Sequence, residues 1–514
     1  MRISVKVILG FIFASFVVVR CFAGSPNSET MDRINALTLD GLEDAYNFDF
    51  NGANNKFDEA LSIDPSHPRP HVSKAVLGLW KFLMSKSDSD YQIILSLADK
   101  AIDAGEKYVE QHGDNGEAFI CLGTSYGYRA FAHARTKSYL KAAWDAKKSY
   151  DYLYDAVKLD PHLYDAYLGL GLYHYYVASI PKPLQWIVSI LGISGDSEQG
   201  MREIRTAMDK GFFTKTEAKY YYATLLPWYS GDYEMSEQIL ADLGRRYPNN
   251  AMFAFSLAVW EIRRNDVRTA KGRLASILSM KDKSIPAVDQ FVHYKLAECY
   301  FRLQDYKLAI SEYLAFLKEY HDDVYIATSN YRVGLCYELF GERSTALLYY
   351  EQAAKAHHNF GDDAYSVRHA SVRLKYPLAA SDTLMIAAQN ALKSGNYDKA
   401  INLFMMLKSQ PGNSPEELAE AEFGIGSAYF EKAAYADALQ EFQAIFSISL
   451  RDERWLIPWA RFQSALCYLK LNNLPAAKKE FEQVLSYDDY DFENWVSFRA
   501  KRELEQLHKK SGRG

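Results

Sequence analysis

The sequence lacks the short motifs that carry most enzyme chemistry. None of HExxH, the P-loop, GxSxG or CxxC occurs in its 514 residues. Gly424 and Gly426 stand two residues apart, but their segment has helical periodicity and follows no strand. His357 and His358 could bind a metal at one edge, yet no third ligand is apparent. We therefore expect no catalytic residues, no cofactor and no metal, since an enzyme would need a constellation assembled from distant segments.

An excess of basic charge is also missing. The chain carries 59 Lys and Arg against 65 Asp and Glu, a formal net charge of −6. Nucleic-acid binding usually needs a basic stripe, so nucleic acid is not expected as a partner. The one basic cluster, Arg499 to Lys510, is interpreted as the solvated face of a final capping helix.

The amino-terminal apolar run, Val7 to Val19, is too short to span a bilayer. Arg2 and Lys6 precede it, and small residues then stand at the third and first positions before a cleavage point after Ala23. Residues 1–23 are therefore predicted to be a signal peptide. The mature chain is expected in the periplasm or outside the cell, where peripheral membrane association remains open.

Cysteine is scarce, with five residues. Cys21 would suggest a lipoprotein, but Arg20 stands where lipid modification needs a small residue, so soluble export is favoured and an uncleaved anchor is a third alternative. Three cysteines recur at one repeat position, immediately before a tyrosine, and equivalent points of stacked helices lie about 10 Å apart, beyond disulfide reach. We expect buried free thiols. The cysteines left after cleavage are Cys121, Cys299, Cys336 and Cys467.

A spacing recurs from end to end. A small residue is followed four positions later by a large apolar residue and seven positions later by another small or apolar one. The clearest examples are Ala270-Leu274-Ile277, Ala309-Tyr313-Phe316, Ala346-Tyr350-Ala353, Ala400-Phe404-Leu407, Ala438-Phe442-Ile445 and Ala477-Phe481-Val484. The small residues stand 39, 37, 54, 38 and 39 residues apart, and Ser236 precedes the first by 34. A period near 34 indicates tetratricopeptide repeats.

The residue types suit two antiparallel helices that pack closely. A Gly or Ala twelve residues earlier, as at Gly334 and Gly426, lets the backbones approach, and the large residue fills the space beside the contact. Stacked pairs form a right-handed solenoid. We predict an all-α fold of about eleven helix pairs, with elongated helices in the amino-terminal half. The predicted units are residues 30–260, 261–362 and 378–510, with a joint at the 54-residue step between Asp362 and Pro377.

One stretch departs from repeat sequence: a glycine-rich segment from Gly169, an apolar segment between prolines from Pro181, and Leu191 to Gly200. It resembles the tetratricopeptide repeat protein 39 family, which includes the fungal inclusion body clearance protein. The resemblance covers about residues 30–260. It is specific mainly at Leu191, Gly192, Gly195, Asp196 and Gly200. It implies an all-helical adaptor without catalytic residues, although those relatives are intracellular and this chain has an export signal.

That motif also has a structural explanation without a ligand. Gly195 would allow a turn, Asp196 or Ser197 would cap the next helix, and Glu198 would favour its first turn. His174, in the preceding aromatic helix, is interpreted as a packing histidine.

Binding is the remaining function. First-helix residues expected on the concave side are largely aromatic, which suits an apolar or amphipathic segment of a partner protein. The alternatives are a groove filled by the chain's own side chains and a carrier of a lipid or other apolar ligand. The candidate groove consists of Tyr221, Leu225, Trp228, Phe255, Phe291, Tyr294, Phe301, Tyr331, Phe423, Phe430, Trp459 and Phe462. We expect a non-catalytic exported scaffold with protein partners, possible envelope proteins among them.

Overall fold

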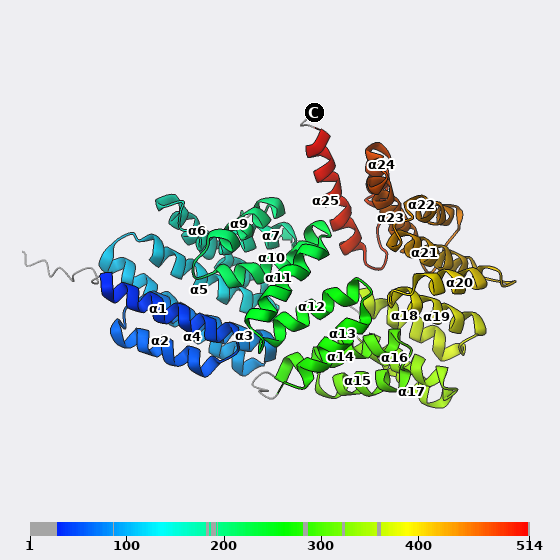
Figure 1. Cartoon of the computed structure of the whole chain (residues 1–514), viewed down its shortest axis with the longest axis horizontal. Coiled ribbons are helices and arrows are strands. Elements are labelled where there is room, and N and C mark those ends of the chain that lie inside the picture. The colour runs from blue at the N-terminus through cyan, green and yellow to red at the C-terminus, as the bar shows by residue number, and fades with distance from the viewer. Residues whose placement is uncertain are drawn as a thin grey trace, which may run out of the picture.

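The computed structural model describes residues 28–85, 87–180, 185–186, 192, 194–280, 286–320, 324–356 and 361–511. Every regular element in these ranges is a helix, and none is a strand. The helices run along a solenoid from α1 to α24, and α25 returns toward the middle of the molecule (Figure 1). The predicted all-α, right-handed solenoid of tetratricopeptide-type helix pairs is confirmed. No helix in the described ranges has both the length and the apolar character needed to cross a membrane.

Each helix packs mainly on its neighbours in the chain. The amino-terminal helices are α1 (Ser28–Tyr46), α2 (Phe50–Ile63), α3 (Pro68–Ser85), α4 (Asp88–His112), α5 (Gly116–Arg135), α6 (Tyr139–Leu159), α7 (Ala166–Ala178), α9 (Ser197–Lys210), α10 (Lys215–Ser230), α11 (Tyr233–Arg246), α12 (Ala251–Arg263) and α13 (Val267–Leu278). The later ones are α14 (Pro286–Arg302), α15 (Tyr306–Glu319), α16 (Ile326–Leu339), α17 (Arg343–Lys355), α18 (Gly361–Lys375), α19 (Ala380–Lys393), α20 (Tyr397–Lys408), α21 (Pro415–Glu431), α22 (Tyr435–Ala444), the 3-10 turn η2 (Ile445–Ser447), α23 (Leu456–Lys470), α24 (Leu474–Val484) and α25 (Glu493–Ser511).

The predicted close packing between the two helices of each pair is present. The recurring small and large residues of α13, α15, α17, α20, α22 and α24 are buried. A Cβ added to Gly334 of α16 would lie 2.5 Å from the ring of Tyr350 on α17. One added to Gly426 would lie 2.8 Å from the Phe442 ring. Contacts this short leave no room for a Cβ unless the ring moves, so glycine lets the two helices approach closely at these two positions.

Proline in α10 leaves a backbone acceptor that another helix satisfies. Pro227 lies inside the helix and has no N–H to donate to the carbonyl oxygen of Ala223. The hydroxyl of Ser236, on α11, donates to that oxygen at 2.5 Å in a buried position. The small residue of this repeat is therefore a serine because it completes the hydrogen bonding of the helix that it packs against.

The 54-residue step contains a complete extra helix, α18, which packs on α16 and α17. Asp363 of α18 accepts hydrogen bonds from the backbone N–H groups of Tyr325 and Thr328 and from the Thr328 hydroxyl, at 2.7 to 2.9 Å. It thereby caps the start of α16, which has no capping side chain of its own. The expected joint between sub-arrays is thus a packed helix.

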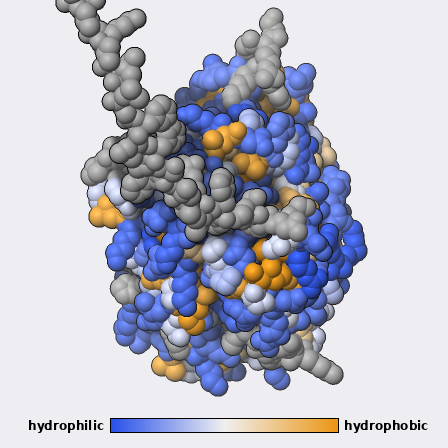
Figure 2. Space-filling view, turned by 90° about the vertical axis from the view of Figure 1, so that its left-hand side faces the viewer, coloured by the Kyte–Doolittle hydropathy of each residue, from blue (hydrophilic) through white to orange (hydrophobic). Residues whose placement is uncertain are grey.

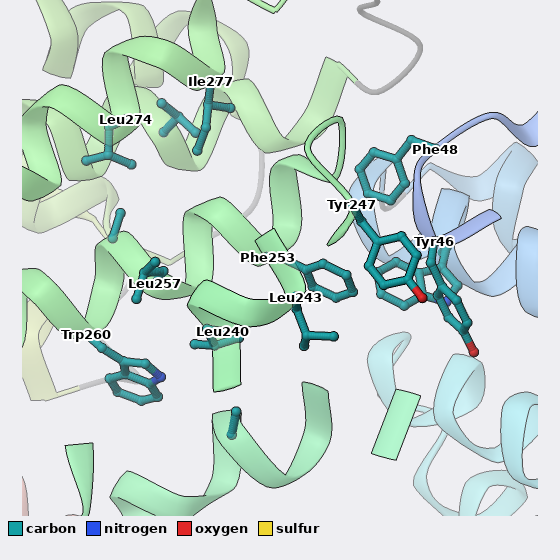
Figure 3. Packing of buried hydrophobic residues seen from close by; sticks show 14 of the residues in the cluster. Tyr46, Phe48, Leu240, Leu243, Tyr247, Phe253, Leu257, Trp260, Leu274 and Ile277 are labelled. Atoms are coloured by element: carbon teal, nitrogen blue, oxygen red, sulfur yellow. The ribbon is translucent and has the colours of Figure 1, made fainter. Parts of the chain in front are cut away.

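The amino-terminal helices also pack against the middle of the chain. Figure 3 shows Tyr46 and Phe48 beside Tyr247 and Phe253, within a cluster that continues to Trp260 and α13. The Tyr46 and Tyr247 ring centroids are 5.8 Å apart. This hydrophobic core contains residues from both sides of residue 260. The predicted boundary between the first two units therefore lies within continuous packing.

Helix α25 departs from the expectation of a solvated basic face. Arg499 and Arg502 are only 7% and 4% exposed. The guanidinium of Arg499 donates to the carbonyl oxygen of Pro227 on α10, and that of Arg502 lies 4.2 Å from the centre of the Tyr229 ring. The interpretation of these two residues as solvated was wrong, because α25 packs against α10 as well as against α23 and α24.

The cysteine prediction is confirmed for the described residues. Cys121, Cys299, Cys336 and Cys467 are all buried and free. Burial raises the pKa of the Cys121 thiol to about 11 and that of Cys299 to about 12. These thiols are therefore protonated at neutral pH and act as small apolar residues.

Candidate functional site

The predicted concave aromatic residues are occupied by packing within the chain. Five are buried: Leu225, Tyr294, Phe301, Tyr331 and Phe462. Seven are partly buried: Tyr221, Trp228, Phe255, Phe291, Phe423, Phe430 and Trp459. They belong to several separate hydrophobic clusters and do not form one site. Partner binding by these residues stays a prediction.

Two tryptophans show how the inner face is filled. The ring of Trp228 packs edge-on against Trp260 and is covered by the Arg263 guanidinium, 4.5 Å from its centre. Trp459 stacks on Trp495 with ring centroids 4.8 Å apart. Since each ring has a face covered by a residue of the chain and an edge contact or stack beside it, less aromatic surface is left for an apolar ligand at these points.

The inner face instead presents a cluster of charges on the first helices of three pairs. On α14, Glu298 lies between two cations: its carboxylate accepts from Lys295 Nζ at 2.6 Å and from Arg302 Nη2 at 3.2 Å. Burial acts to raise the pKa of Glu298, but Lys295 and Arg302 lower it to about 2. Arg332 of α16 and Lys393 of α19 complete the group, which we call the inner-face cluster.

The last two cations make no direct contact with a carboxylate in the described residues, although Asp362 and Glu298 are close enough to act on Lys393. In the described part of the chain, neither Arg332 nor Lys393 forms an ion pair. The Arg332 guanidinium lies 4.5 Å from the centre of the Phe301 ring, on α14. Part of the Lys393 side chain is exposed to solvent. Its ammonium group is nevertheless surrounded by protein, and this burial, together with the positive charges of Arg302 and Arg332, lowers the pKa of Lys393 to about 8. The four cations thus outnumber the two carboxylates that act on them, Glu298 and Asp362, an arrangement that can bind an anion.

Asp362 and Glu420 lie nearby on α18 and α21. Burial raises the pKa of Asp362 from its ordinary value, and Glu298 adds to this effect. Burial also raises the pKa of Glu420 to about 8, with a further contribution from Glu453. Glu420 is therefore largely protonated at pH 7, so it does not neutralise the inner-face cluster.

A second feature lies on the outer side, where α4, α5 and α6 form a groove of about 450 Å³. We call it the outer groove. Its lining residues are Leu95, Asp99, Arg129, His133, Leu140, Lys141, Trp144 and Asp145. Trp144 and Leu140, one turn apart on α6, are 58% and 56% exposed. Figure 2 shows the end of the molecule to which the amino-terminal helices belong, where apolar side chains form small patches on a largely hydrophilic surface.

The floor of the outer groove is a fixed polar network. Arg129 donates two hydrogen bonds to buried Asp145, both at 2.8 Å, and one to Asp99 at 2.5 Å. His133 Nδ1 pairs with the Tyr91 hydroxyl at 2.8 Å. Burial lowers the pKa of His133, although Asp145 acts in the opposite direction. This groove was not predicted from the sequence, where Leu140 and Trp144 at adjacent turns of one helix were its only signal.

The motif before α9 has a structural role. Asp196 caps α9 by accepting from the backbone N–H groups of Glu198 and Gln199, as predicted. Gly195 has no left-handed backbone. A Cβ there would lie 2.3 Å from the backbone nitrogen of Ala178, so close packing against the end of α7 requires glycine, and the expected reason was wrong.

The other two glycines of the motif are needed for two different reasons. Gly192 has a φ of +60°, while a Cβ added to Gly200 would lie 2.6 Å from the backbone oxygen of Gly171. Leu191 lies outside the described residues.

Few groups in the described ranges suit metal or acid–base chemistry. No set of three or more His, Cys, Asp or Glu there could hold a metal ion. His174 is a packing histidine, as expected, buried on α7 with its Nδ1 2.6 Å from Glu203 Oε2. His357 and His358, like the predicted signal peptide, lie outside the described residues.

Comparison with known proteins agrees with this architecture. Residues 165–362 match the Iml2/Tetratricopeptide repeat protein 39 family, and residues 459–488 match a tetratricopeptide repeat family. The chain therefore contains tetratricopeptide repeats. The family match shares residues 165–260 with the resemblance expected from sequence and extends beyond it to residue 362. A search of curated proteins gives no match.

Solved structures similar to this repeat protein have low sequence identity. A tetratricopeptide repeat protein from Parabacteroides merdae is 19% identical, covering 56% of this chain and 99% of its own, with a TM-score of 0.24. Yeast Tom70 is 12% identical over 94% of this chain and 97% of its own, with a TM-score of 0.25. A human IFIT1 dimer with m7Gppp-AAAA is 13% identical over 90% and 95%, with a TM-score of 0.29.

Proposed function

We propose that the chain is an exported, non-catalytic scaffold that holds an acidic segment of a partner protein against its inner face. Tetratricopeptide repeats support a protein-interaction scaffold. Arg332 and Lys393, which form no ion pair in the described residues, lie beside Arg302 and Lys295. This excess of positive charge is the reason for proposing an acidic ligand. Carboxylates of a partner would supply the anionic charge that the cluster lacks.

The composition of the cluster favours a peptide over a nucleic acid. Glu298 stands among the cations and would repel a continuous phosphate backbone, and the chain as a whole is acidic. An apolar carrier is less well supported, because Trp228, Phe301 and Trp459 pack against other residues of the chain.

The binding proposal can be tested by fluorescence anisotropy with a labelled twelve-residue peptide of alternating Glu and Ser, and with its Gln counterpart. We expect Arg332→Gln and Lys393→Gln each to weaken binding of the Glu peptide roughly fivefold, the loss of about 1 kcal/mol typical of a solvent-accessible ion pair. The matched control is Lys307→Gln, because Lys307 on α15 is exposed and forms no ion pair in the described residues. Equal binding of the Gln peptide, or tighter binding of single-stranded DNA, would contradict the proposal.

Export is a separate part of the proposal and rests on residues 1–23. Mass spectrometry of the protein purified from its native source should find an amino-terminal peptide that begins at Gly24. A peptide that retains Met1, or a lipid on Cys21, would show that soluble export is wrong while leaving the binding proposal intact.

A further inference from the structure

Exposed apolar side chains are concentrated on α4 and α6. Six large ones, each more than a third exposed, lie on these two helices: Ile93, Tyr139, Leu140, Trp144, Tyr154 and Leu159. Single exposed apolar residues are normal on a soluble protein, but two large ones at adjacent turns beside a groove, as Leu140 and Trp144 are, are typical of an interaction site. Trp144 and Leu140 both line the outer groove, and tryptophan is among the residues that contribute most to protein interfaces.

The outer groove is already ordered without a ligand. Asp145 and Asp99 hold the Arg129 guanidinium, and Tyr91 holds the His133 ring. A partner would therefore not have to immobilise these side chains or satisfy their hydrogen bonds, which lowers the free-energy cost of association. Only Trp144 and Leu140 remain to be covered, and both present apolar surface.

The two edges of the outer groove differ in charge. On the α6 edge, Lys141 forms no ion pair within the described ranges, and Lys148 lies two turns further along the same helix. On the α4 edge, exposed Asp103 stands one turn after Asp99, whose carboxylate already pairs with Arg129. A ligand that lies along the groove thus meets a basic edge on one side and an acidic edge on the other.

We propose that the outer groove is a docking site, separate from the inner-face cluster, for an amphipathic helix of a partner protein. The apolar stripe of that helix would cover Leu140 and Trp144, its acidic flank would face Lys141, and its basic flank would face Asp103. An amphipathic helix fits because it offers apolar anchors at adjacent turns and charges on both flanks.

The test uses three helical peptides, each eighteen residues long and carrying the same fluorescent label. The first has a leucine stripe with Glu on one flank and Lys on the other, the second has the same stripe with Lys on both flanks, and the third has the composition of the first in scrambled order. We expect the first to bind the wild-type chain at least tenfold more tightly than the other two. Lys141→Glu makes both edges acidic, so it should reverse the preference between the first and second peptides.

Two further variants and a matched control locate the site. Leu140→Ser and Trp144→Ala should each weaken binding of the first peptide at least tenfold, whereas Leu348→Ser, equally exposed on α17, should change nothing. Circular dichroism should show unchanged thermal unfolding for all four variants, since the altered side chains are exposed.

Several results would overturn the proposal. Equal binding of the scrambled peptide, an equal effect of Leu348→Ser, or unchanged preference in Lys141→Glu would each exclude a charge-matched helix. Dimerisation of the chain in light scattering that Trp144→Ala abolishes would show that a second copy covers the groove instead.

Discussion

The guanidinium of Arg499 donates a hydrogen bond to the carbonyl oxygen of Pro227, 272 residues earlier in the chain, at a distance of 3.0 Å. The contact is buried, and Arg499 also pairs with Glu503 on its own helix. The solenoid is therefore closed by a contact between its last helix and α10 (Figure 1).

Arg499→Ala should open this closure. The substitution removes the contact with Pro227 and leaves the carboxylate of Glu503 buried without its cation, which typically costs about 3 to 5 kcal/mol. Small-angle scattering should show a larger radius of gyration, and denaturant unfolding should show the lower stability. Lys501→Ala, exposed on the same helix, is the control; if both variants behave alike, α25 does not close the solenoid in solution.

Glu217 should make stability depend on pH. Burial raises its pKa to about 7, although the hydrogen bond from Tyr128 acts in the other direction. An unfolded glutamate ionises near pH 4.3, so between about pH 4.3 and 7 the folded state holds more protons and becomes less stable as pH rises. Glu217→Gln should therefore raise the free energy of unfolding by about 3 kcal/mol at pH 8 and change it little at pH 4.

The control for that experiment is Glu234→Gln, at an exposed position on α11. It should shift the thermal unfolding midpoint equally little at both pH values. A pH-independent effect of Glu217→Gln would mean that the pKa of this carboxyl is the same in the folded and the unfolded protein.

Ser236→Ala should destabilise the chain by about 1 to 3 kcal/mol, because it leaves the Ala223 carbonyl oxygen buried without a donor. In a Pro227→Ala background, residue 227 regains the N–H that bonds to that oxygen, so Ser236→Ala should then cost much less. Chemical denaturation of the four proteins measures the coupling. Additive effects would show that the two residues do not share this acceptor.

Ala433→Gly should stabilise the turn between α21 and α22. Ala433 has a φ of +59°, a left-handed conformation that costs non-glycine residues about 1 to 2 kcal/mol and is offset only in part by the flexibility of unfolded glycine. We expect a gain of about 0.5 to 1 kcal/mol in thermal unfolding. Ala436→Gly, exposed within α22, should lose a similar amount.

The aromatic residues first expected in a partner groove should behave as core. Phe301 is 3% exposed, so Phe301→Ala should cost about 3 to 5 kcal/mol. Trp459→Ala should also lower the melting temperature, because its ring stacks on Trp495. If both variants melt like the wild type but lose a partner, the open-groove interpretation would be restored.

Local features of this fold were predictable from sequence because a repeat is defined by neighbours in the chain. The buried triads, such as Ala270-Leu274-Ile277, and the free thiols depend only on the register of two adjacent helices. The Asp196 cap was predictable for the same reason, since the side chain bonds to residues two and three positions later.

Contacts between distant repeats were not predictable. Arg499 reaches Pro227 only because small rotations at many helix pairs add up, and no single repeat encodes that sum. The inner-face cluster was missed for a related reason: Lys393 is exposed and looks like any surface lysine until α14 and α16 are seen around it. The side chains of α18 were likewise attributed to a joint, although Asp363 caps α16.

The packing of Tyr46 against Tyr247 has a consequence during synthesis. The Asn250 side chain donates to the Tyr46 carbonyl oxygen at 2.7 Å, so α1 completes its contacts only after about two hundred more residues have been made. At roughly 5 to 20 residues per second, the ribosome needs on the order of ten to forty seconds for that length. During this interval α1 can pack only on the neighbouring amino-terminal helices, and the face that Tyr247 and Asn250 later cover stays without its native contacts.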